Sequence, residues 1–180
     1  MDYLILLYHS ISPLSRSIYS ITPEKFKKQL ELLLELGYHV ITLDRVLSHD
    51  IPSKAVVLTF DDGNLSDYEY VLPELLEYEF SATFFITVQN IGKTLHLNRS
   101  QIREMSELGM SIQSHSMTHP FLPDLPPEKI KWELSESKRI LEEITGKPVQ
   151  FFALPGGRGN AIVKRIAVEC GYKAICTSKI

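Results

Sequence analysis

The chain has 180 residues, which is long enough for one domain with a sizeable core, and its 44% apolar and 23% charged residues are typical of a soluble globular protein. A net charge of -3 without any basic run argues against nucleic-acid binding, and no apolar stretch approaches the roughly 18 residues of a membrane span. The N-terminus lacks the basic start and cleavage site of a signal peptide, so the default location is cytoplasmic.

Seven apolar segments alternate with segments of helical periodicity, and this alternation predicts a parallel sheet with helical crossovers. The expected strands are residues 3–8, 38–42, 55–60, 82–87, 110–114, 149–154 and 172–177. The expected helices begin after Thr22, at residue 43, at residue 65 with a kink at Pro73, after Ser100, at Pro126-Pro127 and after Asn160. No linker interrupts the chain, so we expect one domain over residues 1–180.

A short motif with glycine at its third position occurs three times, as Glu35-Leu36-Gly37-Tyr38, Glu107-Leu108-Gly109-Met110 and Glu169-Cys170-Gly171-Tyr172. Each motif is predicted to end a helix at a glycine in the left-handed conformation, just before a strand.

Polar residues collect where the expected strands end. His9, Asp61, Asp62, His115 and Pro155 all follow strand C-termini. Parallel α/β folds build their sites on that face, so we expect these residues to lie near one another.

The two carboxylates Asp61 and Asp62 need a partner, because burying them unpaired is costly. His115 and His119 are four residues apart and can point the same way. Two imidazoles and one carboxylate suit a catalytic divalent metal, most simply Zn²⁺, and the second carboxylate could act as general base on a water. The alternatives are two unrelated histidines and an Asp62 that caps the following helix.

The residues Thr59-Phe60-Asp61-Asp62-Gly63, followed by His115-Ser116-Met117-Thr118-His119-Pro120, resemble the motifs of the polysaccharide deacetylase family. This family is also known as the NodB homology domain or carbohydrate esterase family 4. The start Tyr8-His9-Ser10-Ile11 resembles the branch acting on poly-N-acetylglucosamine-type polymers. The resemblance implies a distorted (β/α)7-type barrel, which we expect to be incomplete at the C-terminus. It also implies hydrolysis of an N-acetyl or occasionally an O-acetyl group on a sugar.

The resemblance also implies roles for single residues. Asp61 would be the catalytic base, and Asp62, His115 and His119 would be the metal ligands. Gly156, in Ala153-Leu154-Pro155-Gly156-Gly157, matches the position whose backbone N–H helps to hold the oxyanion. As a residue pattern alone, this glycine pair could simply be a turn.

Two departures from the family pattern concern catalysis. Ala153 stands where the family has an arginine that orients the base, and Arg158 is a candidate substitute. The Leu-x-His that usually supplies the general acid is absent, so the chain could be a fragment, use another residue as the acid, or be catalytically impaired. His9 could be that other acid, could line or support the site, or could be purely structural. The family usually ends with a further strand, and without it the barrel could have an unpaired edge.

Three functions remain open from the sequence. The first is a metal-dependent carbohydrate N-deacetylase, the second is a catalytically impaired glycan-binding or scaffold protein, and the third is a hydrolase of a non-sugar C–N bond. The expected partner is an N-acetylated carbohydrate. Tyr19 and Phe121 could stack on its rings or could simply cover the core. Cys170 and Cys176 are expected to be buried free thiols.

Overall fold

The computed structural model describes residues 3–14, 17–48 and 51–178. Its main sheet is entirely parallel, and its strands are hydrogen-bonded in the order β1-β5-β6-β7-β8-β9, with β4 paired to the first half of β5. The bounds of these strands are β1 Tyr3–Tyr8, β4 His39–Ile41, β5 Ala55–Phe60, β6 Thr83–Ile86, β7 Ser111–Ser114, β8 Phe151–Ala153 and β9 Ala174–Cys176. All seven expected strands are therefore confirmed.

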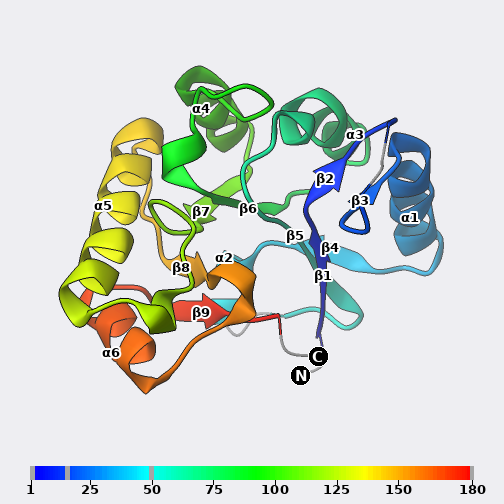
Figure 1. Cartoon of the computed structure of the whole chain (residues 1–180). Helices are drawn as coiled ribbons and strands as arrows, with labels where there is room; N and C mark the ends of the chain where they lie inside the picture. Colours follow the sequence, from blue (N-terminus) through cyan, green and yellow to red (C-terminus); the bar gives the residue numbers. More distant parts are fainter. Residues whose placement is uncertain (1–2, 15–16, 49–50, 179–180) are drawn as a thin grey trace.

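The longer helices lie around the outside of the curled sheet, whereas the short helix α2 packs against its inner face (Figure 1). Their bounds are α1 Pro23–Glu35, α2 Leu43–Leu47, α3 Leu72–Glu77, α4 Arg99–Glu107, α5 Pro127–Thr145 and α6 Ala161–Glu169. Short helical turns are η1 Asp67–Val71, η2 Val88–Asn90, η3 Leu122–Asp124 and η4 Pro155–Gly157, and a small second sheet pairs β2 Ser10–Ile11 with β3 Ser20–Ile21. No sequence pattern predicted this second sheet. Among the described helices, none is long and apolar enough to cross a membrane.

Three helix predictions need correction or refinement. The helix expected after Ser100 begins two residues earlier, because Asn98 is its N-cap and forms a reciprocal capping box with Gln101. The kink expected at Pro73 takes the form of a π turn, in which the Leu72 N–H bonds to the Asp67 carbonyl. The second helix, expected over residues 43–49, ends at Leu47, and residue 49 itself lies outside the described residues.

The three predicted left-handed glycines at helix ends are confirmed, because Gly37, Gly109 and Gly171 have φ values of +69°, +92° and +82°. At these positions a glycine avoids the steric cost that a side chain would have.

The core has two layers, because successive side chains of a strand point to opposite faces. On β5, Val56 and Leu58 pack outward toward the helices, whereas Ala55 and Val57 pack inside the curl with Phe85. Both faces of β5 are thus buried, which explains its continuously apolar sequence.

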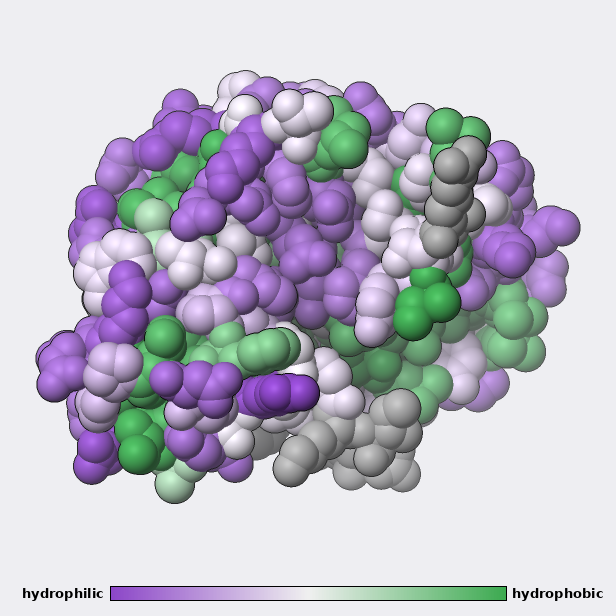
Figure 2. Space-filling view, viewed as in Figure 1, coloured by the Kyte–Doolittle hydropathy of each residue, from purple (hydrophilic) through white to green (hydrophobic). Residues whose placement is uncertain are grey.

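The curled sheet is not closed between β1 and β9 in the described structure. These strands are the two ends of the hydrogen-bonded order, and together they line an apolar opening of about 740 Å³. Leu4, Ile5 and Leu7 of β1 are 51%, 47% and 42% exposed. Figure 2 shows apolar side chains gathered over β1. The fold is therefore a half-closed form of the predicted barrel.

Candidate metal centre

Aromatic stacking holds the C-terminal end of β5 in position between its two neighbouring strands. The Phe60 ring stacks between Tyr8 of β1 and Phe84 of β6, with ring centroids 5.0 and 4.9 Å away. These three residues are register partners in adjacent strands. The next residue, Asp61, donates its N–H to the Tyr8 carbonyl at 3.0 Å, so the ladder continues to the first carboxylate.

The backbone then turns so that both carboxylates reach one site. Asp62 has φ +79° and Gly63 has φ +73°, so Asp62 leaves the extended conformation in which neighbouring side chains point in opposite directions. Asp61 Oδ2 lies 3.8 Å, and Asp62 Oδ1 3.7 Å, from Nε2 of His115. The left-handed conformation is uncommon for aspartate and concentrates at functional sites. No side-chain cap from Asp62 holds the following helical turn, whose N-cap is Ser66.

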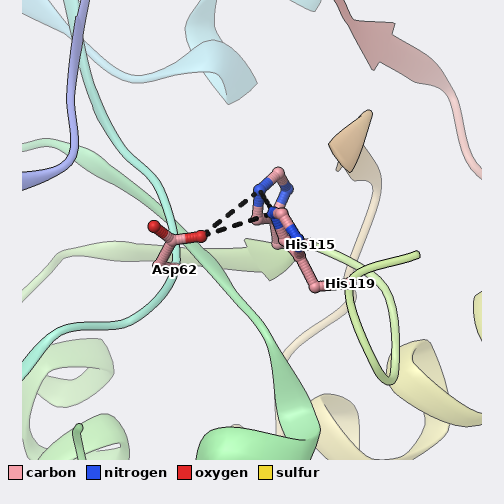
Figure 3. A group of neighbouring side chains, drawn as sticks. All are labelled: Asp62, His115 and His119. Carbon is pink, nitrogen blue, oxygen red and sulfur yellow. Dashed lines mark hydrogen bonds and ion pairs between the residues drawn. The ribbon is translucent and has the colours of Figure 1, made fainter. Parts of the chain in front are cut away.

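Asp62, His115 and His119 converge on one point (Figure 3). Asp62 Oδ1 lies 3.7 Å from Nε2 of His115 and 3.6 Å from Nε2 of His119, and the two Nε2 atoms are 3.1 Å apart. A zinc ion lies about 2.0–2.2 Å from each ligand atom, which places ligand pairs roughly 3.0–3.5 Å apart. The three side chains therefore fit one divalent ion.

His115 is held in the tautomer that a metal needs. Its Nδ1 lies 2.9 Å from the Ala153 carbonyl oxygen, so Nδ1 donates to that carbonyl and Nε2 faces the ligand cluster. The ring is 2% exposed. Burial, and then the charge of His119, lower the pKa of His115 to about 4, which favours the neutral imidazole that binds metal.

Asp61 differs from Asp62 in its surroundings. Asp61 is 7% exposed, and its Oδ1 is buried without a hydrogen-bond partner in the described structure. Burial, and then the charge of Asp62, raise the pKa of Asp61 to about 8. A carboxyl group with a free oxygen and a raised pKa suits proton transfer near neutral pH.

The other predicted site residues border the same pocket, whose volume is about 970 Å³. His9 and Gly156 line this pocket together with Asp61 and the three candidate ligands. Gly156 has φ +61°, and a Cβ at this position would lie 2.5 Å from the Phe121 ring. The His9 ring lies 5.3 Å from the ring of Tyr19.

Arg158 does not replace the arginine of the family motif in this structure. Its guanidinium carbon lies 4.4 Å from the centroid of the Phe121 ring, and within the described residues it forms no ion pair with Asp61. The two cysteines are free but only half-buried, so the expectation of buried thiols is wrong in degree.

Sequence reasoning missed the groups that hold the histidines. The Ala153 carbonyl is a backbone acceptor and has no sequence signature. Ser116 Oγ accepts the His119 N–H at 2.9 Å, and Glu133 accepts hydrogen bonds from Met117 and Thr118. The position of Glu133 could have been noticed in the sequence, because it lies on the same face of its helix as the apolar residues Ile130 and Leu134.

Comparison with known proteins is consistent with this geometry. The family model described as polysaccharide deacetylase matches residues 48–175, which is more than half of the chain. The chain belongs to the polysaccharide deacetylase family. The predicted family resemblance is thereby confirmed, and the Asp61-Asp62 and His115-to-His119 motifs both lie within the matched region.

Individual relatives align with most of this chain. YxkH of Bacillus subtilis is 32% identical over 97% of this chain, and the peptidoglycan-N-acetylglucosamine deacetylase of Bacillus cereus is 31% identical over 69% of it. The structure of the Streptococcus pyogenes deacetylase PplD, solved with acetate, superposes with a TM-score of 0.91 at 30% identity, covering 96% of this chain and 82% of that one. This chain spans only 64% of YxkH and 57% of the Bacillus cereus enzyme.

Proposed function

We propose that this protein is a metal-dependent hydrolase that removes N-acetyl groups from an amino-sugar polysaccharide or oligosaccharide. The observation that carries the proposal is the convergence of Asp62, His115 and His119 beside a buried, unpaired Asp61. Family membership supports deacetylation of a polysaccharide. The similarity to the peptidoglycan-N-acetylglucosamine deacetylase of Bacillus cereus supports an N-acetylglucosamine unit.

Asp62 Oδ1 and the Nε2 atoms of His115 and His119 would hold the metal, for which zinc is our proposal. When bound, such an ion acts as a Lewis acid toward a carbonyl and lowers the pKa of water. The Ala153 carbonyl holds His115 Nδ1, so that Nε2 would be free to bind the metal.

Asp61 would be the general base. It takes a proton from the attacking water as the water oxygen bonds to the acetamide carbon. The Gly156 N–H donates a hydrogen bond to the developing oxyanion. As the C–N bond breaks, the leaving nitrogen takes up a proton, and acetate and a free amine are formed. Of the imidazoles lining the described pocket, His9 is the one outside the ligand set, and we assign it to this protonation.

The test is acetate release from N-acetylglucosamine oligomers by the zinc-loaded protein and its Asp61→Asn variant. The variant keeps the ligands but loses the base, so we expect acetate release to fall by about 10²- to 10⁴-fold while zinc stays bound. Asp44→Asn is the matched control, because Asp44 is exposed and does not line the pocket. Its rate should equal that of the wild type.

Unchanged acetate release in Asp61→Asn would sink the assignment of the base. The runner-up is a glycan-binding protein without activity, which the lack of an arginine partner for Asp61 in the described structure favours. Glycan binding with zinc present but no acetate released by the wild type would support that alternative. Release of acetate from a non-sugar acetamide alone would favour a different hydrolase.

A further inference from the structure

Glu133 is a fully buried acidic residue in the middle of α5, and its carboxyl group faces the loop that carries both histidines. Its exposed fraction is 0%. Oε2 accepts the backbone N–H groups of Met117 at 3.0 Å and Thr118 at 2.8 Å. Oε1 accepts the Thr118 hydroxyl at 2.6 Å. A buried acidic group is costly unless it is hydrogen-bonded, and here three donors converge on it.

All three donors lie between the two histidines. The opposite side of this loop is held by η2, because the carbonyls of Ser116 and Met117 accept the N–H groups of Val88 and Gln89 at 3.3 and 2.8 Å. Glu133 therefore clamps the loop from the α5 side, while η2 clamps it from the other side.

The loop needs such support because its backbone is strained. Ser116 has φ +67° and His119 has φ +63°, and both are non-glycine residues in the left-handed region. Such conformations cost free energy and persist only where surrounding contacts determine them. The hydrogen bonds to Glu133 satisfy the N–H groups of the two residues between these strained positions.

The two histidines depend on this support to different degrees. His115 directly follows β7, is buried, and is fixed through Nδ1 by the Ala153 carbonyl. The His119 side chain is 39% exposed, its ring forms polar contacts only with the other two candidate ligands in the described structure, and its backbone N–H bonds to Ser116 Oγ within the same loop. The position of the His119 backbone, from which the ring extends, is therefore set by the loop, and the loop is held in part by Glu133.

We infer that Glu133 is a positioning residue of the metal centre, which holds residues 116–118 so that His119 Nε2 meets the ion shared with His115 and Asp62. This inference rests on the proposed function for the identity of the ligands. It adds a residue that touches neither metal nor substrate and acts through the loop backbone.

The test measures the Co²⁺ and Zn²⁺ affinity of the folded chain and the visible absorption spectrum of the Co²⁺ complex. Glu133→Ala removes all three hydrogen bonds, and we expect a loss of affinity of about 10- to 100-fold with an altered Co²⁺ spectrum. Glu133→Gln can still accept the two N–H groups through its oxygen and donate its amide to the Thr118 hydroxyl. Its affinity should therefore lie closer to the wild type than that of Glu133→Ala.

Leu141→Ala is the matched control, because Leu141 is equally buried on the same helix and does not contact the loop through any hydrogen bond. It should lower stability but leave metal affinity and the Co²⁺ spectrum unchanged. Thr118→Val removes one hydrogen bond at nearly constant shape, so it still tests the inference should Glu133→Ala fail to fold. We expect Thr118→Val to weaken metal binding by a smaller factor.

Wild-type affinity and spectrum in Glu133→Ala, or in Thr118→Val where the alanine variant does not fold, would overturn the inference while leaving the proposed function intact. An equal loss in Leu141→Ala would overturn it as well, because general destabilisation would then explain the effect. A wild-type protein that binds neither ion would overturn the proposed function together with the inference.

Discussion

At Gly156 the backbone and the packing both exclude a side chain. Its φ of +61° is in the left-handed region, and an added Cβ would approach the Phe121 ring to 2.5 Å. Gly156→Ala should therefore displace Phe121 or tilt the Gly156 N–H away from the oxyanion. We expect acetate release to fall by about 10- to 100-fold.

The control for this prediction is Gly37→Ala. Gly37 also has positive φ, at +69°, but a Cβ there meets nothing within 4 Å. Both variants should lose about 1–2 kcal/mol of unfolding free energy from backbone strain, measured by chemical denaturation. Acetate release that is equally high in both variants would contradict the assigned role of Gly156.

Single residues differed in how far the sequence could predict them. Asp61, Asp62, His115 and His119 could be located because their residue types carry the chemistry and each lies near a strand end. Arg158 was a plausible substitute from its position alone, yet its guanidinium packs on Phe121. Sequence distance does not determine the direction of a long side chain in a loop.

At the scale of elements, η1 contains a buried acid that the proposed reaction does not use. Asp67 is 0% exposed, and neither carboxyl oxygen forms a hydrogen bond in the described structure. Burial is the main cause that raises its pKa well above the ordinary value. The folded protein therefore keeps the Asp67 proton at a pH where the unfolded chain, with an aspartate pKa of about 3.9, has lost it.

Because the folded protein keeps this proton, Asp67 makes the stability of the wild type fall as pH rises. The contribution of Asp67 is fully present below the unfolded pKa and declines as pH rises toward the raised folded pKa. Asp67→Asn does not titrate, so its stability relative to the wild type should increase between pH 5 and pH 8, by up to about 1.4 kcal/mol per pH unit. Urea unfolding of both proteins in EDTA, which excludes bound metal, measures this difference. A difference that is the same at both pH values would contradict the prediction.

The helices and strands were predictable because the hydrophobic periodicity, the helix N-cap residues and the glycines at helix ends all indicated the same elements. The start of α4 was misplaced because Asn98 and Ser100 are both good N-cap residues, and only the reciprocal bond with Gln101 decides between them. Glu133 was missed because an acidic residue on a long helix is usually solvated. The donors that stabilise it come from a loop that helical periodicity cannot place.

At the scale of the whole molecule, the parallel sheet gathers distant residues at one edge. β5 and β7 are both neighbours of β6, so the ends of β5 and β7 bring Asp61 and Asp62 close to His115. The sequence could predict this common edge from strand polarity. The extent to which the sheet closes depends on side-chain packing across the β1–β9 opening, which no local pattern encodes.

The central claim is that Asp62, His115 and His119 hold a metal on which deacetylation depends. The most direct measurement is acetate release from N-acetylglucosamine oligomers by wild-type protein treated with a chelator, dialysed, and then titrated with Zn²⁺. We predict that chelation abolishes acetate release and that about one equivalent of Zn²⁺ restores it, as expected for three ligands around one ion. Acetate release that persists at the original rate in the metal-free protein would contradict the account.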